Sequence, residues 1–131
     1  MTTTVSFTLS VRNGAQAVDF YKRAFGATEI TRAQSPDGDV VVQLDVDGCR
    51  FFVADESPDN GNFSPESLDQ RTTVRLALIA DDPDALAVRA VAAGAREVYP
   101  VADQPYGWRL GRVVDPYGHH WEIGRPLHEH P

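Results

Sequence analysis

The chain contains an internal repeat, and this repeat limits the folds that its sequence can adopt. Residues 23–30 read RAFGATEI and residues 91–98 read VAAGAREV, so the same Gly-Ala pair recurs 68 residues later. A turn with a glycine followed by an apolar stretch also recurs, at Gly48 and at Gly118, 70 residues apart. Repeated segments of this kind each form one structural unit that needs its neighbour to bury a core. We therefore expect two similar modules.

Each half has the pattern of a βαβββ module. Residues 5–11 alternate between apolar and polar side chains, which is typical of a strand with one buried face. A helix is predicted over residues 14–25, where apolar residues recur at spacings of three and four, and Gly26 ends it. A second helix is predicted over residues 83–93, with Asp82 as its N-cap. The predicted fold class is α+β, with two βαβββ modules that enclose a concave cavity between their sheets.

The length of 131 residues suits a single domain made of both modules. We expect module one over about residues 4–55, a linker over 56–72, module two over about 73–124 and a tail over 125–131. The linker carries turn and cap residues without a sustained hydrophobic period.

Composition excludes some partners. Lys and Arg number 12 against 19 Asp and Glu, so the formal net charge is −7, which argues against nucleic acid or an anionic membrane as a partner. The single cysteine, Cys49, cannot form an internal disulfide and is expected to be a packed thiol. The first residues do not resemble a signal peptide, and no apolar run has the length of a membrane span. We expect a soluble, cytoplasmic protein.

Two segments carry a resemblance to a known family. Residues 17–27, AVDFYKRAFGA, resemble the first helix of the vicinal-oxygen-chelate superfamily, and residues 111–123, GRVVDPYGHHWEI, resemble its closing hairpin. That superfamily includes glyoxalase I, extradiol dioxygenases, fosfomycin-resistance transferases and bleomycin-resistance binding proteins. The DPYGHHW sequence is similar in particular to the PhnB-like branch. The resemblance implies a glyoxalase-like fold over about residues 5–124, and it leaves the reaction open because the fold hosts several chemistries.

The resemblance also implies where a divalent metal would bind in an enzyme of this family. The four positions correspond here to Ser6, Phe52, Arg75 and Glu122. Only Glu122 is a good ligand for a dication, since Phe52 has no lone pair and Arg75 carries a permanent positive charge. We expect Arg75 and Glu122 to form an ion pair instead. The predicted state is a degraded metal site without a cofactor.

The histidines leave an alternative open. His120 and Glu122 share one face of the last predicted strand, so they could form part of a relocated site for a divalent metal. His119 is expected to pack or to hydrogen-bond at the hairpin. Residues 128–130, His-Glu-His, could bind a transition metal only adventitiously, because a terminal tail lacks a preorganised geometry.

The segment around Trp108 could form the wall of a ligand pocket. Tyr106 and Trp108 would offer flat surfaces, and Arg109 would contact an anion. The alternative is that Trp108 closes the core and that the arginine is solvated. The complete set of predicted ligand-binding residues is Ser6, Thr8, Arg50, Phe52, Arg75, Trp108, Arg109, His120 and Glu122.

The sequence is compatible with two functions. The first is a metal-free protein that binds a small molecule such as an antibiotic, as a homodimer, in the manner of the bleomycin-resistance proteins that it resembles. The second is a metal-dependent lyase, isomerase or dioxygenase of the glyoxalase type, which acts on a small oxygenated substrate. In that enzyme Glu122 would be a metal ligand or a general base. The missing ligands favour the first.

Overall fold

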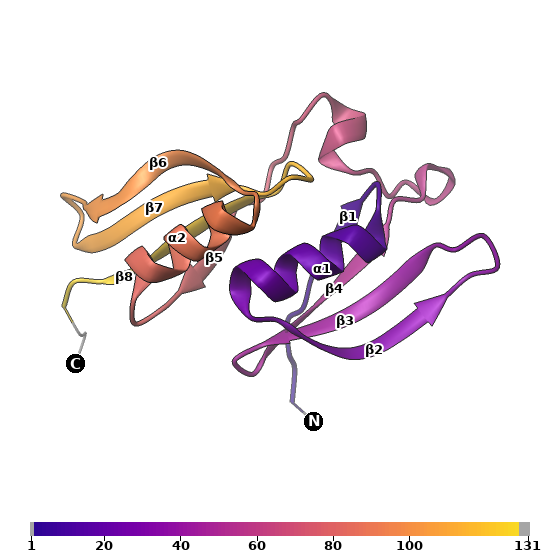
Figure 1. Ribbon diagram of the computed structural model, residues 1–131, viewed down its shortest axis with the longest axis horizontal. Helices are drawn as coiled ribbons and strands as arrows, with labels where there is room; N and C mark the ends of the chain where they lie inside the picture. Colours follow the sequence, from indigo (N-terminus) through magenta and orange to yellow (C-terminus); the bar gives the residue numbers. More distant parts are fainter. Residues whose placement is uncertain (1, 129–131) are drawn as a thin grey trace.

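The computed structural model describes residues 2–128, which form two βαβββ modules (Figure 1). Module one contains β1 (Thr8–Val11), α1 (Gly14–Phe25), β2 (Thr28–Gln34), β3 (Val40–Val46) and β4 (Cys49–Asp55). Module two contains β5 (Leu76–Ile79), α2 (Pro83–Ala93), β6 (Arg96–Asp103), β7 (Trp108–Val114) and β8 (His120–Pro126). The segment between them forms two short 3₁₀ helices, Pro58–Asn60 and Pro65–Leu68. The predicted α+β fold class is confirmed.

Each module has a four-stranded mixed sheet of the same topology. The strand orders are β1-β4-β3-β2 and β5-β8-β7-β6. The first strand of each module runs parallel to the last one, and the other neighbours are antiparallel. This correspondence confirms that the sequence repeat is a structural repeat.

The two helices begin and end where the sequence predicts. The side chain of Asn13 accepts a hydrogen bond from the backbone N–H of Gln16, and Gly26 ends α1 in the left-handed region at φ 71°. The Asp82 side chain accepts from the backbone N–H of Ala85 at 3.0 Å, which confirms it as the N-cap of α2. These local contacts satisfy the backbone groups that a helix end leaves unpaired.

Three local expectations were wrong. The first strand begins at Thr8, and Val5 is 94% exposed, so the alternation of side chains extends beyond the strand itself. The last strand continues to Pro126, where a tail had been expected from residue 125. Cys49 is exposed at the start of β4 and is not a packed thiol. Of the predicted tail motif, Glu129 and His130 lie outside the described residues.

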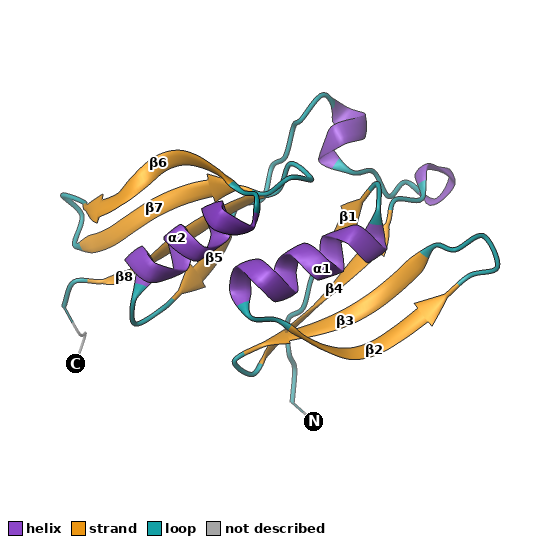
Figure 2. Cartoon of the chain, in the orientation of Figure 1, coloured by secondary structure: helices purple, strands orange, loops and turns teal. Residues whose placement is uncertain are grey.

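The two modules join through their helices and through one buried carboxylate. Helices α1 and α2 are in contact, and both lie on the near side of the sheets in Figure 2. Asp115, from the β7–β8 turn, accepts hydrogen bonds from the Tyr21 hydroxyl at 2.5 Å and from Trp121 Nε1 at 2.9 Å. Because Tyr21 belongs to α1, this network connects the first module to the second.

The sheets therefore lie beside one another instead of face to face. Both helices cover the same side, so the face of each sheet that its helix leaves uncovered, here called the open face, points to the other side (Figure 1). The two open faces do not face one another across a common cavity; instead, residues of both modules, among them Arg50, Phe51 and Leu78, line a hollow of about 590 Å³. Within residues 2–128, neither helix is long and apolar enough to cross a membrane. The cytoplasmic location stays a prediction.

Candidate functional site

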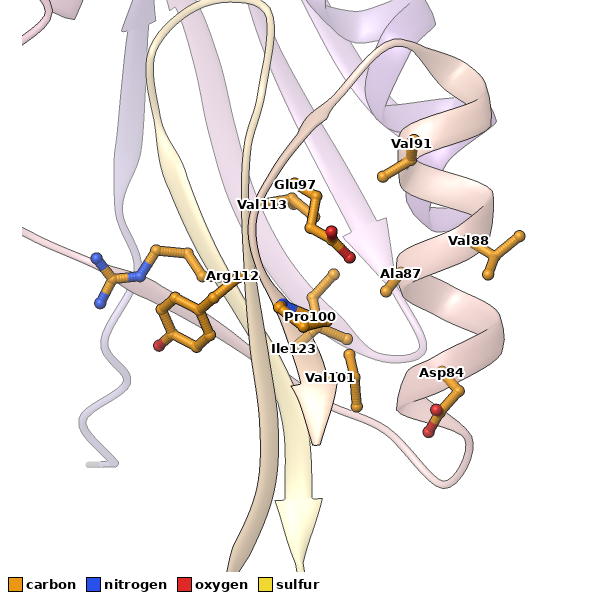
Figure 3. Close-up of a pocket in the computed structure, with 11 residues that line it drawn as sticks. Asp84, Ala87, Val88, Val91, Glu97, Pro100, Val101, Arg112, Val113 and Ile123 are labelled. Carbon is orange, nitrogen blue, oxygen red and sulfur yellow. The ribbon is translucent and has the colours of Figure 1, made fainter. Parts of the chain in front are cut away.

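The open face of the second sheet brings three polar or aromatic side chains, Glu122, Arg112 and Tyr99, into one row. Glu122 on β8 lies opposite Ala77 on β5 and opposite Arg112 on β7, and Arg112 in turn lies opposite Tyr99 on β6. Residues directly opposite one another in a sheet have their side chains on the same face. Figure 3 shows Arg112 on the side of the sheet away from α2, whereas Glu97 extends toward the helix.

The Glu122 carboxylate forms ion pairs with two arginines. Arg75 Nε donates to Glu122 Oε1 at 2.5 Å, and an Arg112 guanidinium nitrogen lies 3.7 Å from the same oxygen. The predicted ion pair between Arg75 and Glu122 is confirmed, and its hydrogen bond raises the pKa of Arg75 above the ordinary value. The Arg112 guanidinium also lies 5.4 Å from the centroid of the Tyr99 ring. Sequence reasoning missed Arg112, because only the strand register places it beside Glu122.

An apolar hollow of about 260 Å³ adjoins this row on the same sheet. Glu122 lines it at one side, and Trp108 and Tyr106 line it from the start of β7 and from the preceding turn. Ala77, Leu78, Ile79, Leu110 and Gly124 complete the lining. Trp108 thus forms a wall of a hollow and is half-buried, as one of the two interpretations of this segment proposed. Tyr106 lines the same hollow as Trp108, as expected, and the role of Tyr106 in binding stays a prediction.

Arg109 does not lie on the open face, contrary to its predicted place in the cavity. Its Nε and one terminal nitrogen donate to the two carboxylate oxygens of Asp84 at 2.7 Å, and the other terminal nitrogen donates to Asp103 at 2.9 Å. Asp84 belongs to α2, so Arg109 points to the helix side. The physical reason is strand alternation, because neighbours such as Trp108 and Arg109 face opposite sides.

The two adjacent histidines differ in their surroundings. His119 Nε2 lies 3.0 Å from the backbone oxygen of Ser10 on β1, so His119 does form a hydrogen bond, but to the first module and not within the hairpin where it was expected. Burial, and then the positive charges of Arg112 and Arg96, lower the pKa of His120. His120 Nδ1 is buried without a hydrogen-bond partner among the described residues.

The residues of the second sheet do not fit a divalent metal. Glu122 is occupied by two guanidinium groups, and His120 lies close to Arg112, so a dication there would meet direct repulsion. Within residues 2–128, no group of three or more His, Cys, Asp or Glu side chains is arranged to hold a metal ion. The alternative of a relocated site at His120 and Glu122 therefore finds no support in the geometry.

The open face of the first sheet carries the other predicted residues. Ser6 Oγ donates to the backbone oxygen of Arg50 at 3.3 Å, and Arg50 Nε lies 3.4 Å from Asp45. Phe52 is half-buried and lies opposite the exposed Thr8. Ser6 and Phe52 offer no charged ligand. They belong to the first module, so one chain does not place them in the same sheet as Arg75 and Glu122.

Two βαβββ modules with open faces form the fold of glyoxalase-like proteins, and the comparison of sequences agrees with this class. The chain belongs to the glyoxalase-like domain family, whose profile matches residues 6–124. An uncharacterized protein of Mycobacterium bovis is 39% identical over 125 residues, which cover 92% of this chain and 82% of the relative. An uncharacterized protein of Mycobacterium tuberculosis is also 39% identical over 125 residues and is covered to 73%.

Solved structures share the fold along nearly the whole chain. TioX from Micromonospora sp. ML1 is 29% identical with a TM-score of 0.75, and the match covers 96% of this chain and 100% of TioX. The fosfomycin resistance protein FosX from Listeria monocytogenes is 18% identical with a TM-score of 0.73, covering 96% and 94%. A glyoxalase-related enzyme from Fulvimarina pelagi is 23% identical with a TM-score of 0.74, covering 95% and 88%. The last two likenesses concern the fold alone.

Proposed function

We propose that this chain is a metal-free protein that binds a small organic molecule on the open face of its second sheet. The observation that carries the proposal is the ion pair between Arg75 and Glu122, at two of the positions where family enzymes would hold a metal. Charge neutralisation by Arg75 removes the reason for a dication to bind at Glu122. The apolar hollow next to Glu122 offers a binding surface for a ligand.

The proposed assembly is a homodimer in which the open face of one protomer's second sheet is covered by the first sheet of its partner. Support comes from the apolar surface that one chain leaves uncovered. Ile79 and Tyr106, which line the hollow, are 66% and 63% exposed, and Phe7 near the edge of the first sheet is 39% exposed. Exposed apolar residues that gather around a hollow mark a surface for a partner or a ligand. The narrower resemblance to the PhnB-like branch stays a prediction.

Three measurements on protein without an affinity tag test this proposal. Sedimentation velocity should give a dimer, elemental analysis should give no stoichiometric Zn, Ni, Mn or Fe, and some member of a panel of metabolites and antibiotics should raise the melting temperature. One bound metal ion per chain that is lost in Glu122→Gln would favour the metal-dependent enzyme instead. A monomer that no compound in a broad panel stabilises would contradict the proposal.

A further inference from the structure

We infer that the ligand of this site is an organic anion with a planar apolar body, whose negative group binds Arg75 and Arg112. The inference rests on the proposed function, since it names the ligand class of the same open face. The side chains concerned are Arg75, Arg112 and Glu122.

The charges of the row do not balance. Arg75, Arg112 and Glu122 together carry one net positive charge, because both guanidiniums share a single carboxylate. Only 24% of the Arg112 side chain and 16% of that of Glu122 are exposed. When a partner or a ligand covers this face, an unpaired positive charge is costly unless an anion neutralises it. A neutral or cationic ligand would leave that charge uncompensated.

The two arginines keep hydrogen-bond donors that Glu122 does not use. A guanidinium has five N–H donors, and Arg75 gives Nε to Glu122 while 62% of its side chain is exposed. The terminal nitrogen of Arg112 lies 3.7 Å from Glu122, beyond hydrogen-bond distance, and 24% of the Arg112 side chain is exposed although its Nε is buried. Carboxylates and related anions accept two parallel hydrogen bonds from such groups. Glu122 thus positions two cations and does not exhaust their donors.

The surface beside the charges is apolar and aromatic. The hollow of about 260 Å³ begins at Glu122 and is lined by Trp108, Tyr106 and aliphatic side chains. Aromatic faces bind flat apolar groups by offset stacking. A ligand that fills the hollow against Trp108 reaches Glu122, which lies against both arginines. The geometry therefore combines an anionic head group with a planar body.

The test compares three probes that share one body and differ in charge: 2-naphthoate, 2-naphthamide and 2-naphthylmethylammonium. Binding is followed by the indole N–H resonance of Trp108 in ¹⁵N-labelled protein. Trp121, which is 2% exposed and donates to Asp115, is the internal control that should not move. We expect naphthoate to bind most tightly and the ammonium compound most weakly.

Variants then assign the effect to the arginine pair. Arg75→Gln should weaken naphthoate binding about tenfold, since a hydrogen bond to a charged group is lost, and Arg75→Lys should keep part of the affinity. Glu122→Gln should tighten it about threefold by removing a nearby negative charge. Arg71→Gln, at an exposed arginine of the linker, makes the same change of net charge as Arg75→Gln and should have no effect on naphthoate binding.

The outcomes separate this inference from the proposed function. If the amide or the ammonium probe shifts Trp108 at least as strongly as naphthoate, the site binds small molecules and the anion inference is wrong. If Arg75→Gln and Arg71→Gln weaken binding equally, the effect is general electrostatics, and the inference is also overturned. If no probe shifts Trp108, the inference fails, and the dimer and the panel measurements decide the proposed function by themselves.

Discussion

The two modules share one topology, but their helices are buried to very different extents. Helix α1 buries seven residues: Gly14, Ala17, Val18, Phe20, Tyr21, Ala24 and Phe25. Helix α2 buries only Pro83 and Ala90, and it leaves Val88 70% exposed and Val91 43% exposed. At equivalent positions of the repeat, Phe20 and Phe25 correspond to Val88 and Ala93. Phe20 and Phe25 contact the rings of Tyr117 and Trp121 in the second module, whereas Val88 lines a hollow.

The smaller side chains leave space in module two. A hollow of about 400 Å³ lies between α2 and its sheet, and Figure 3 shows Ala87, Val88 and Val91 on the helix side of it with Val113 on the sheet side. Module one fills the corresponding layer with stacked rings such as Tyr21 and Phe25. The first module therefore holds most of the core, whereas the second combines looser packing with the charged row of the candidate site.

The comparison predicts the largest effect for a pair of equivalent alanine substitutions. Phe20→Ala should lower the free energy of unfolding by about 3 to 5 kcal/mol, since the ring is 1% exposed and its loss leaves a cavity. Val88→Ala should change it by less than about 0.5 kcal/mol. Urea denaturation of both variants measures the difference. Similar costs at the two positions would show that the helices contribute equally, and the contrast between modules would be lost.

The buried carboxylate between the modules gives the next largest effect. Asp115→Ala should destabilise the protein by about 3 kcal/mol, because the Tyr21 hydroxyl and the Trp121 indole N–H would both lose their acceptor inside the core. Asp103→Ala is the matched control, since that carboxylate is 64% exposed. Its effect should stay within about 0.5 kcal/mol. An equal loss in both variants, measured by denaturation, would mean that Asp115 does not connect the modules.

Tyr21 adds a dependence on pH. Burial, and then the carboxylate of Asp115, raise the pKa of Tyr21 well above 10. The folded state then keeps a proton that the unfolded state releases, so stability should fall as the pH rises above 10. Tyr21→Phe should cost about 2 kcal/mol near pH 7 through the lost hydrogen bond. Denaturation from pH 7 to pH 11 should show the gap between wild type and variant narrowing, and a constant gap would contradict this assignment.

The smallest effect is expected from filling the hollow of module two. Ala87→Leu should add about 0.5 to 1 kcal/mol to the free energy of unfolding, because the new methyl groups enter the space beneath α2. Ala92→Leu is the control, on an exposed position of the same helix. Thermal denaturation compares the two variants, and an equal gain would show that the added leucine does not act by filling the hollow, since alanine already has the highest helix propensity.

Much of the fold could be predicted because its determinants are local. The caps at Asp82 and Gly26 and the helix between residues 14 and 25 depend on neighbours in the chain, and the structure has them where they were expected. The pairing of Arg75 with Glu122 could also be predicted, since the repeat and the family resemblance place both residues on adjoining strands. Arg109 was predicted in one site with Trp108, although neighbouring residues of a strand face opposite sides of the sheet.

The sequence by itself determined, through its internal repeat, that the chain folds as two βαβββ modules, and its resemblance to the family predicted that the four ligand positions hold an unsuitable set of residues. Only the tertiary structure decided how the two modules are oriented relative to one another. In that orientation the sheets lie beside one another, and their open faces stay uncovered (Figure 1). It also decided that Arg112 joins Glu122 and that Asp115 connects α1 to the second module. The physical reason is distance along the chain: caps and amphipathic stripes act within a few residues, whereas Tyr21 and Asp115 are 94 residues apart and meet only after the modules have packed.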